Sequence, residues 1–295
     1  MVEYNGKKLT IMACSKCNTS CKHCYISYKG NRTPDELMNL VMKFRYKYKI
    51  EINGAEILTD LGYIESYPLI GQDFIMTNGI EIYKKPEVLD FLISRGIKQI
   101  FMSFHFGIHD DISSVEVAML ESNIKNILKR NLKLKLYVTV TQKNYQYVHE
   151  IVEKARKYGA VSVRFTNFIK QGNAIDLSDN NILTKSQIND FLDSVSKERK
   201  LYDQDVMDIE RCGSFGKGNS SKFNCYAINN NVILTPDNNI YPCLFLAKPG
   251  YEIGYYDGDT LNLYNEYNND GNDCFVRDYC NYGDVKQLRK KLEVK

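Results

Sequence analysis

The middle of the chain alternates short apolar runs, rich in β-branched residues, with longer segments in which apolar residues recur at helical spacing. This alternation is typical of repeated strand–helix units, whose strands form a parallel sheet. The pattern predicts six strands, over residues 9–13, 50–53, 74–76, 100–103, 134–140 and 161–165. It predicts helices over residues 34–48, 86–94, 114–129, 147–158 and 185–197.

Capping residues support these helix boundaries. Thr33 and Thr184 stand where an N-cap is expected, and Pro34 suits a first helical position. After residue 200 the composition changes to short pieces rich in Asn, Asp, Gly and Tyr, with further cysteines. We therefore expect a barrel-like domain over residues 1–200 and a smaller domain over residues 201–295.

Charge and hydropathy narrow the function classes. The 295 residues carry 39 basic and 36 acidic side chains, a net charge of +3, without the basic footprint of a nucleic-acid binder. No apolar run approaches the ~18 residues that cross a bilayer, and the N-terminus has no signal-peptide pattern. We expect a soluble, cytoplasmic protein that binds neither membranes nor nucleic acid. Nine cysteines in such a protein are typical of metal-binding or catalytic roles.

Three of the cysteines form the most informative motif. Cys17, Cys21 and Cys24 have C-x3-C-x2-C spacing, so their thiolates can hold three irons of a [4Fe–4S] cluster and leave the fourth open to a ligand. The same residues could instead form part of a zinc site, although the three-residue gap suits zinc less well. With the aromatic Tyr25 directly after it, the loop resembles the cluster loop of the radical SAM family.

Other segments resemble radical SAM motifs at the ends of predicted strands. The family's Gly-Gly-Glu motif is matched by Gly54, Ala55 and Glu56, with Ala55 in place of the second glycine. Thr77-Asn78-Gly79 follows the third predicted strand, and Ser103 ends the fourth. Residues 163–165 and 171–173 resemble the family's sixth strand and the loop that follows it. These ends should meet at one edge of a parallel barrel, where function gathers.

The resemblance implies an α/β fold, a partial (β/α)6 TIM-type barrel with a small C-terminal iron–sulfur domain. It also implies that the open iron chelates S-adenosylmethionine, whose reductive cleavage gives a 5′-deoxyadenosyl radical that removes hydrogen from a substrate. The cofactor-binding residues implied are Tyr25, Gly54, Ala55, Glu56, Thr77, Asn78 and Ser103.

The second cysteine group resembles the SPASM and twitch domains of radical SAM maturases. The resemblance rests on a hairpin that begins with Cys225, a Thr-Pro-Asp turn in which Asn238 replaces the usual glycine, and the Tyr-Pro-Cys sequence that ends at Cys243. Asn tolerates the left-handed conformation that such a turn needs. The resemblance implies one auxiliary [4Fe–4S] cluster, for which a structural zinc ion is the alternative. Its implied ligands are Cys225, Cys243, Cys274 and Cys280.

Two cysteines and the histidines stand outside these sets. We expect Cys14 to be buried at the end of the first strand. Cys212 could be an auxiliary ligand, a buried bystander or a reactive thiol. In the radical SAM peptide epimerases that this layout resembles, a cysteine donates hydrogen to the substrate radical, and Cys212 would be that catalytic residue here. The four histidines have no metal-ligand spacing. We expect His149 to be solvated and His105 either to touch cofactor or substrate or to be partly buried.

The leading hypothesis is a radical SAM enzyme with two [4Fe–4S] clusters that modifies a ribosomal peptide or small protein during maturation, specifically by epimerisation. The alternative is an oxidative radical SAM enzyme, which forms thioether or carbon–carbon crosslinks or dehydrogenates or epimerises a small molecule such as an aminoglycoside. A zinc- or cluster-stabilised binding protein is the non-enzyme alternative. Flavodoxin or ferredoxin would donate electrons. Because the cluster loop begins at residue 17, we expect no fused leader-peptide reader, so the peptide would be held by the barrel rim and C-terminal domain or delivered by a separate protein.

Overall fold

The chain divides into two compact units, each built around one sheet. The computed structural model describes residues 7–202, 207–211, 215, 227 and 231–265. The first unit comprises Met1–Asn18, Tyr25–Asp73 and Phe223–Lys295, and the second comprises Thr19–Cys24 and Phe74–Lys222. The cysteine loop is therefore shared, with Cys17 in the first unit and Cys21 and Cys24 in the second.

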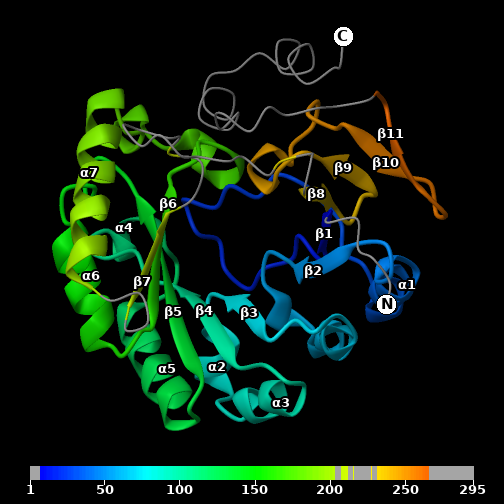
Figure 1. The fold of residues 1–295 in the computed structure, drawn as a ribbon, viewed down its shortest axis with the longest axis horizontal. Coiled ribbons are helices and arrows are strands. Elements are labelled where there is room, and N and C mark those ends of the chain that lie inside the picture. Colours follow the sequence, from blue (N-terminus) through cyan, green and yellow to red (C-terminus); the bar gives the residue numbers. More distant parts are fainter. Residues whose placement is uncertain (1–6, 203–206, 212–214, 216–226, 228–230, 266–295) are drawn as a thin grey trace. The chain divides into compact units, whose positions relative to one another are not determined.

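The first unit has a mixed sheet of order β11-β10-β9-β8-β1-β2 (Figure 1). The strand β1 lies between β2 and β8 and is parallel to both, whereas β8 to β11 pair as antiparallel neighbours. The strands are β1 (Lys8–Met12), β2 (Lys49–Asn53), β8 (Asn231–Leu234), β9 (Asn239–Tyr241), β10 (Gly254–Tyr256) and β11 (Leu261–Leu263). The helices are α1 (Pro34–Phe44) and the 3-10 segments η1 (Ile57–Thr59), η2 (Leu61–Ile70) and η6 (Leu244–Leu246).

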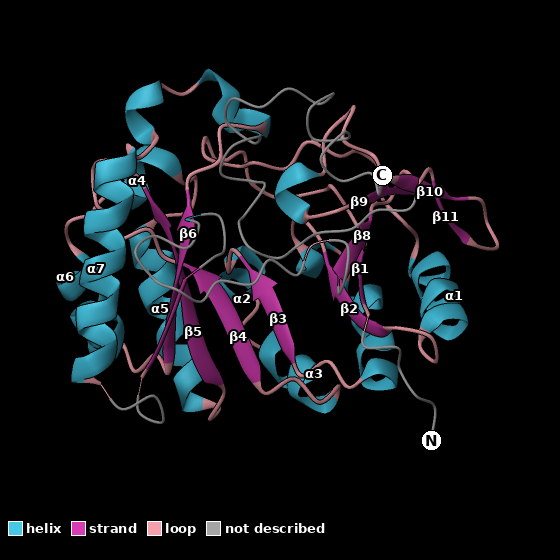
Figure 2. Cartoon of the chain, turned by 45° about the horizontal axis from the view of Figure 1, so that its top comes forward, coloured by secondary structure: helices cyan, strands magenta, loops and turns pink. Residues whose placement is uncertain are grey.

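The second unit has a wholly parallel sheet of order β3-β4-β5-β6-β7, with helices between successive strands (Figure 2). Its strands are β3 (Phe74–Thr77), β4 (Gln99–Ser103), β5 (Lys133–Val140), β6 (Ser162–Asn167) and β7 (Asp208–Arg211). The helices are α2 (Ile80–Lys84), α3 (Val88–Ser94), α4 (His109–Ile112), α5 (Val117–Lys129), α6 (Val148–Lys157) and α7 (Lys185–Leu201), with 3-10 segments η3 (Gly172–Asp176) and η4 (Asp179–Asn181).

The two faces of the parallel sheet differ in chemistry. One face carries fully buried aliphatic and aromatic residues and packs on the helices, as the contact of Phe165 with Phe191 of α7 shows at 5.3 Å between ring centroids. The other face carries a row of aromatic and charged side chains that touch across all five strands; four of them are half-buried and Phe101 is buried. This row consists of Phe74, Phe101, Tyr137, Arg164 and Glu210.

All six strands predicted from the sequence are present, and parallel strands followed by helices confirm the α/β fold of the partial TIM-barrel type. Thr33 and Thr184 both form capping boxes, with Glu36 and Gln187. The first helix was predicted to reach residue 48 but ends at Phe44, because the N–H groups of Lys47 and Tyr48 both donate to the Phe44 carbonyl in a turn. The expected boundary near residue 200 stays a prediction, although β8, beyond that point, pairs directly with β1.

Among the described residues, no helix is both long and apolar enough to cross a membrane.

Candidate functional site

The cysteine loop of the second unit is fastened to loops that follow β4 and β6. The Asn173 side-chain amide donates to the Cys21 carbonyl at 3.1 Å, and the Ala174 N–H donates to the Cys24 carbonyl at 3.3 Å. On the β4 side, Nδ1 of His23 contacts the Ile112 carbonyl at 2.9 Å. Since loops after parallel strands gather at the carboxyl edge of a sheet, Cys21 and Cys24 lie at the edge where parallel α/β proteins place their active sites.

The sulfur of Cys21 already has hydrogen-bond donors. The Ser114 N–H donates to it at 3.3 Å, and the hydroxyls of Thr19 and Ser113 lie 3.5 and 3.8 Å away. Hydrogen bonds of this kind stabilise a thiolate and tune the potential of a metal–sulfur centre. Sequence reasoning missed the Ser113-Ser114 segment, because nothing in its local pattern relates it to a cysteine some ninety positions earlier.

Cys17 lies in the first unit, and its sulfur lies 4.0 Å from the side-chain oxygen of Asn18. No three His, Cys, Asp or Glu side chains of the described residues converge so as to hold a metal ion. No disulfide joins the described cysteines, Cys14, Cys17, Cys21, Cys24 and Cys243, to one another. The chemistry of the C-x3-C-x2-C thiols thus fits an iron–sulfur cluster, and their role as ligands stays a prediction.

The segment that resembles Gly-Gly-Glu is held against the start of the cysteine loop. The N–H groups of Ala55 and Glu56 donate to the carbonyls of Cys14 and Lys16 at 2.9 and 3.2 Å. A Cβ added to Gly54 would lie 2.7 Å from the Cys14 sulfur, so the close approach requires glycine. Glu56 is 1% exposed, and its carboxylate accepts the Leu58 N–H at 3.1 Å.

Cys14 is a buried bystander, as the sequence predicted. Its side chain is 1% exposed, and the sulfur points to the carbonyls of Lys16 and Glu56, each at 3.7 Å. Burial raises the pKa of the Cys14 thiol above its usual value. Cys14 is therefore a protonated packing residue rather than a thiolate ligand.

The Thr77-Asn78-Gly79 turn is shaped by its own side chains. The Gly79 N–H donates to the Thr77 hydroxyl and the Ile80 N–H donates to the Asn78 side chain, both at 3.0 Å. Gly79 has φ +86°, and its carbonyl accepts the Asn123 side-chain amide of α5 at 2.7 Å. The Asn78 side chain thus binds the first N–H of α2, whose N-cap is Gly79. Asn123, which the sequence did not single out, fixes the turn from a neighbouring helix.

Beyond Ser103 at the half-buried end of β4, three histidines form a cluster that spacing did not predict. The ring of His105 lies 4.4 Å from that of His23 and 5.3 Å from that of His109, between centroids. The Thr139 N–H donates to His105 Nδ1 at 3.0 Å, so the proton of this ring belongs on Nε2. The backbone N–H of His105 donates to Nδ1 of His109 at 3.1 Å.

The cluster holds its rings neutral. His105 is 2% exposed, and burial, followed by the neighbouring charges of His23 and His109, holds its pKa well below the ordinary 6.5. Burial also lowers the pKa of His23 and of His109, opposed in each case by a backbone carbonyl. His105 is buried, with no partner for its Nε2 among the described residues, and a contact with cofactor or substrate stays a prediction. His149, by contrast, is exposed on α6, with Glu198 at 3.2 Å.

The half-buried face of the parallel sheet offers polar groups beside this edge. Arg164 lies over the Tyr137 ring at 5.7 Å and pairs with Glu210 at 3.5 Å. Burial raises the pKa of the Glu210 carboxyl despite the opposing charge of Arg164. A face of this composition can bind a polar substrate.

The C-terminal strands are described only in part. Asn238 has φ +65°, which confirms the left-handed turn predicted for it. Tyr25 packs edge-on against Phe245 at 5.0 Å, two residues beyond the half-buried Cys243. The expected auxiliary ligands Cys225, Cys274 and Cys280 and the expected hydrogen donor Cys212 lie outside the described residues.

Comparison with solved structures identifies the architecture. SuiB from Streptococcus suis, solved with the precursor peptide SuiA, matches with a TM-score of 0.65 and 14% identity over 96% of this chain. The protein anSMEcpe, solved with AdoMet, matches with a TM-score of 0.62 and 16% identity over 84% of this chain and 77% of its own. Both are radical SAM enzymes. The chain has the radical SAM fold.

The likeness concerns the fold alone at this level of identity. The chain spans 66% of SuiB, just under two thirds of its length. No protein-family model and no curated protein sequence matches the chain. Within the radical SAM fold, the strand-end motifs predicted from the sequence lie at the ends of β2, β3 and β4 in their own units.

The left-handed turn at Gly79 gives a stability prediction. Gly79 and Gly96 both have φ +86°, a backbone conformation that is strained for alanine. In Gly79→Ala the added Cβ would also lie 2.6 Å from Nδ2 of Asn123, whereas the space around Gly96 is open. We expect Gly96→Ala to lower the free energy of unfolding by about 1–2 kcal/mol and Gly79→Ala by clearly more. Urea unfolding of both variants tests this, and equal losses would show that Asn123 yields without cost.

The neutral histidine cluster predicts a pH dependence of stability. Below about pH 6.5, His105 takes up a proton in the unfolded chain but not in the folded protein. The free energy of unfolding therefore decreases as the pH is lowered, by up to ~1.4 kcal/mol per pH unit for one such group. His105→Asn keeps an acceptor for Thr139 and should flatten this fall between about pH 6.5 and 5. His149→Asn, on the exposed face of α6, is the matched control. A fall of unchanged steepness in His105→Asn would contradict the assignment.

Proposed function

We propose that this chain is a radical SAM enzyme that modifies a peptide. The observation that carries the proposal is the fastening of the Cys21–Cys24 part of the cysteine loop to the loops after β4 and β6 within a radical SAM fold. A buried structural zinc site needs no such edge position. A radical enzyme does, because its reactive centre has to face a substrate at the carboxyl ends of the strands.

In this proposal Cys17, Cys21 and Cys24 hold a [4Fe–4S] cluster, and S-adenosylmethionine binds beside it. When bound, this pair supplies one-electron cleavage of a carbon–sulfur bond, which gives a radical able to remove hydrogen from a substrate. The Ser114 N–H, 3.3 Å from the Cys21 sulfur, would hydrogen-bond that sulfur as a cluster ligand.

The strand-end residues would bind S-adenosylmethionine mainly through backbone. Gly54 and Ala55 are held close to Cys14, and the buried Glu56 carboxylate is oriented by the Leu58 N–H to receive an ammonium group. Thr77, Asn78 and Ser103 end β3 and β4 in the second unit, where they would contact the rest of the cofactor. Tyr25, packed on Phe245, is the remaining residue that we propose contacts the cofactor.

The peptide substrate is supported by the solved relatives. SuiB was solved with the precursor peptide SuiA, and anSMEcpe with AdoMet and the Cp18Cys peptide. The half-buried polar row that runs from Phe74 to Glu210 offers stacking and ionic contacts of the kind a peptide side chain uses. A separate leader-peptide-binding protein and a flavodoxin or ferredoxin as electron donor complete the proposed set of partners.

The specific reaction that we propose is epimerisation, with Cys212 returning hydrogen to the opposite face of the substrate carbon. A second [4Fe–4S] cluster would be held by Cys225, Cys243, Cys274 and Cys280. The support for both is the sequence pattern. Epimerisation leaves the oxidation state of the substrate unchanged, because one hydrogen leaves the carbon and one returns. The thiyl radical left on Cys212 would regain its hydrogen from one electron of the proposed flavodoxin or ferredoxin donor and a proton from solvent. The oxidative alternative removes two hydrogens from the substrate.

Iron content tests the ligand assignment. Anaerobically reconstituted protein should bind about eight irons, as two [4Fe–4S] clusters require, and the triple variant of Cys17, Cys21 and Cys24 to Ala should bind about four. Cys14→Ala, which removes a buried thiol of the same region, should keep about eight. Cys212→Ala should also keep about eight, since a hydrogen donor is no ligand; a fall toward four would make Cys212 a ligand instead. Zinc in place of iron would overturn the proposal.

Isotope incorporation tests the reaction. The reduced enzyme should cleave S-adenosylmethionine and, with a pool of short peptides in deuterated water, give a product that gains one deuterium at an inverted α-carbon. Cys212→Ala should still cleave S-adenosylmethionine but give no deuterated epimer. A product that has lost two hydrogens would favour the oxidative alternative, and an absence of S-adenosylmethionine cleavage would contradict radical SAM chemistry itself.

A further inference from the structure

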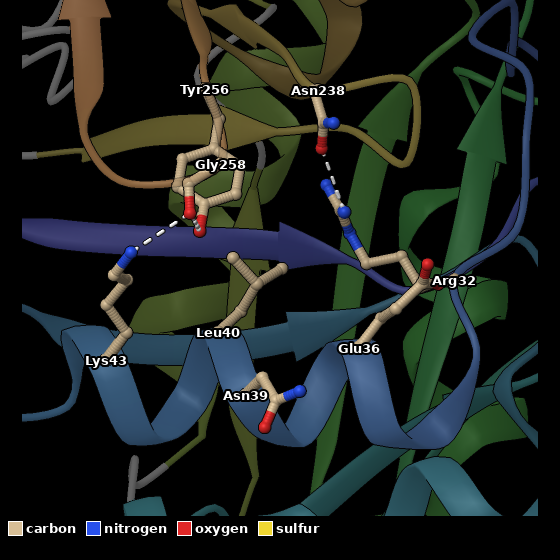
Figure 3. Close-up of a pocket in the computed structure, with 8 residues that line it drawn as sticks. All are labelled: Arg32, Glu36, Asn39, Leu40, Lys43, Asn238, Tyr256 and Gly258. Atoms are coloured by element: carbon tan, nitrogen blue, oxygen red, sulfur yellow. Dashed lines mark hydrogen bonds between the residues drawn. The ribbon is translucent and has the colours of Figure 1, made fainter.

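A polar pocket of about 360 Å³ lies in the first unit, between one face of α1 and the turns of the C-terminal strands (Figure 3). Residues 36, 39, 40 and 43 come from successive turns of α1, so they share one face of that helix. None of the lining residues is a candidate cluster or cofactor residue. They are Arg32, Glu36, Asn39, Leu40, Lys43, Asn238, Tyr256 and Gly258.

Arg32 forms the base of this pocket, with its side chain 7% exposed. Nη1 donates to the Asn238 side chain at 3.0 Å and Nη2 donates to the Thr235 carbonyl, as Figure 3 shows for the first of these. These bonds use two of the five N–H groups of the guanidinium. The Nε N–H is buried and has no partner among the described residues, so it is left to be satisfied.

No described carboxylate lies within ion-pair distance of Arg32. Burial lowers the pKa of Arg32, and the charges of Glu36 and Asp237 oppose this shift. Glu36, the one carboxylate of the lining, has an oxygen engaged by the Thr33 N–H at 2.7 Å in the capping box. A buried guanidinium with an unpartnered N–H and no direct ion pair is costly, so the pocket favours an anionic acceptor at Arg32.

The rest of the lining suits a peptide. Asn39 and Asn238 carry side-chain amides on the two walls, which can pair with the N–H and C=O groups of a main chain. Leu40 and the Tyr256 ring supply apolar surface for methylene groups. Lys43 adds a second cation on the same helix face, held by the Gly258 carbonyl at 3.0 Å and by Asp259, whose side chain is 85% exposed.

From these features we propose that the pocket binds an acidic side chain, aspartate or glutamate, of a peptide. The carboxylate meets Arg32 at the base and the flanking peptide groups pair with the amides of Asn39 and Asn238. That this peptide is a segment of the enzyme's own substrate rests on the proposed function. The binding of an acidic peptide does not, because no cluster or cofactor residue lines the pocket.

Calorimetric titration tests the site on the full-length, anaerobically purified chain. The probe is an N-acetylated, C-amidated tripeptide Gly-Glu-Gly, compared with its Gly-Gln-Gly counterpart and with inorganic phosphate. We expect the Glu peptide to bind about tenfold or more tightly than the Gln peptide, the effect of one charge-assisted hydrogen bond. Equal affinity for the two peptides would overturn the proposal, as would binding of phosphate without the Glu peptide.

Matched variants locate the binding. Asn39→Asp is isosteric, exposed and places a negative charge in the pocket, so we expect it to weaken the Glu peptide about tenfold. Arg32→Gln should abolish the preference for Glu over Gln, and its circular dichroism should match the unaltered chain. Asn180→Asp, the same exposed change in the second unit, should leave the affinity unchanged. Full binding by both Asn39→Asp and Lys43→Gln would place the peptide elsewhere and overturn the assignment, whatever the iron content of the protein.

Discussion

Parallel pairing of β3 to β7 is the constraint on which the candidate site depends. Parallel strands all point the same way, so every loop that follows a strand emerges at one edge of the sheet. Residues that are far apart in the chain, such as Ser114 after β4 and Asn173 after β6, are thereby brought to the same short loop of cysteines. The direction of the strands therefore decides which residues meet at this edge.

Hydrogen bonds to backbone groups hold most of the candidate site in place. Carbonyls and N–H groups hold the cysteine loop, the segment from Gly54 to Glu56 and the Thr77–Gly79 turn, while side chains of Asn and Thr complete the turns. Such contacts survive many changes of side chain. This explains how a chain only 14% identical to SuiB reaches the same fold with a TM-score of 0.65.

Local patterns predicted local structure well. The six strands, the caps at Thr33 and Thr184, the left-handed Asn238 and the buried Cys14 all follow from residue type and spacing within a few positions. What the sequence did not predict depends on pairs distant in the chain. His23 and His105 meet edge-to-face across 82 positions, and Arg32 reaches Asn238 across 206, so neither pair leaves a periodic or spaced signal. The assignments to Cys212, Cys225, Cys274 and Cys280 lie outside the described residues and stay predictions.

The contact between Asn123 and the Gly79 carbonyl has a consequence for the helix that carries it. Asn is a poor helix former, and a buried Asn in the middle of α5 contributes no apolar surface to the core. Helix α5 therefore gives up some of its own stability to hold the shape of a turn that belongs to β3 and α2. If each element were redesigned separately for stability, Asn123 would be replaced first. Helix α5 would then be more stable, but the turn at Gly79 would lose its support.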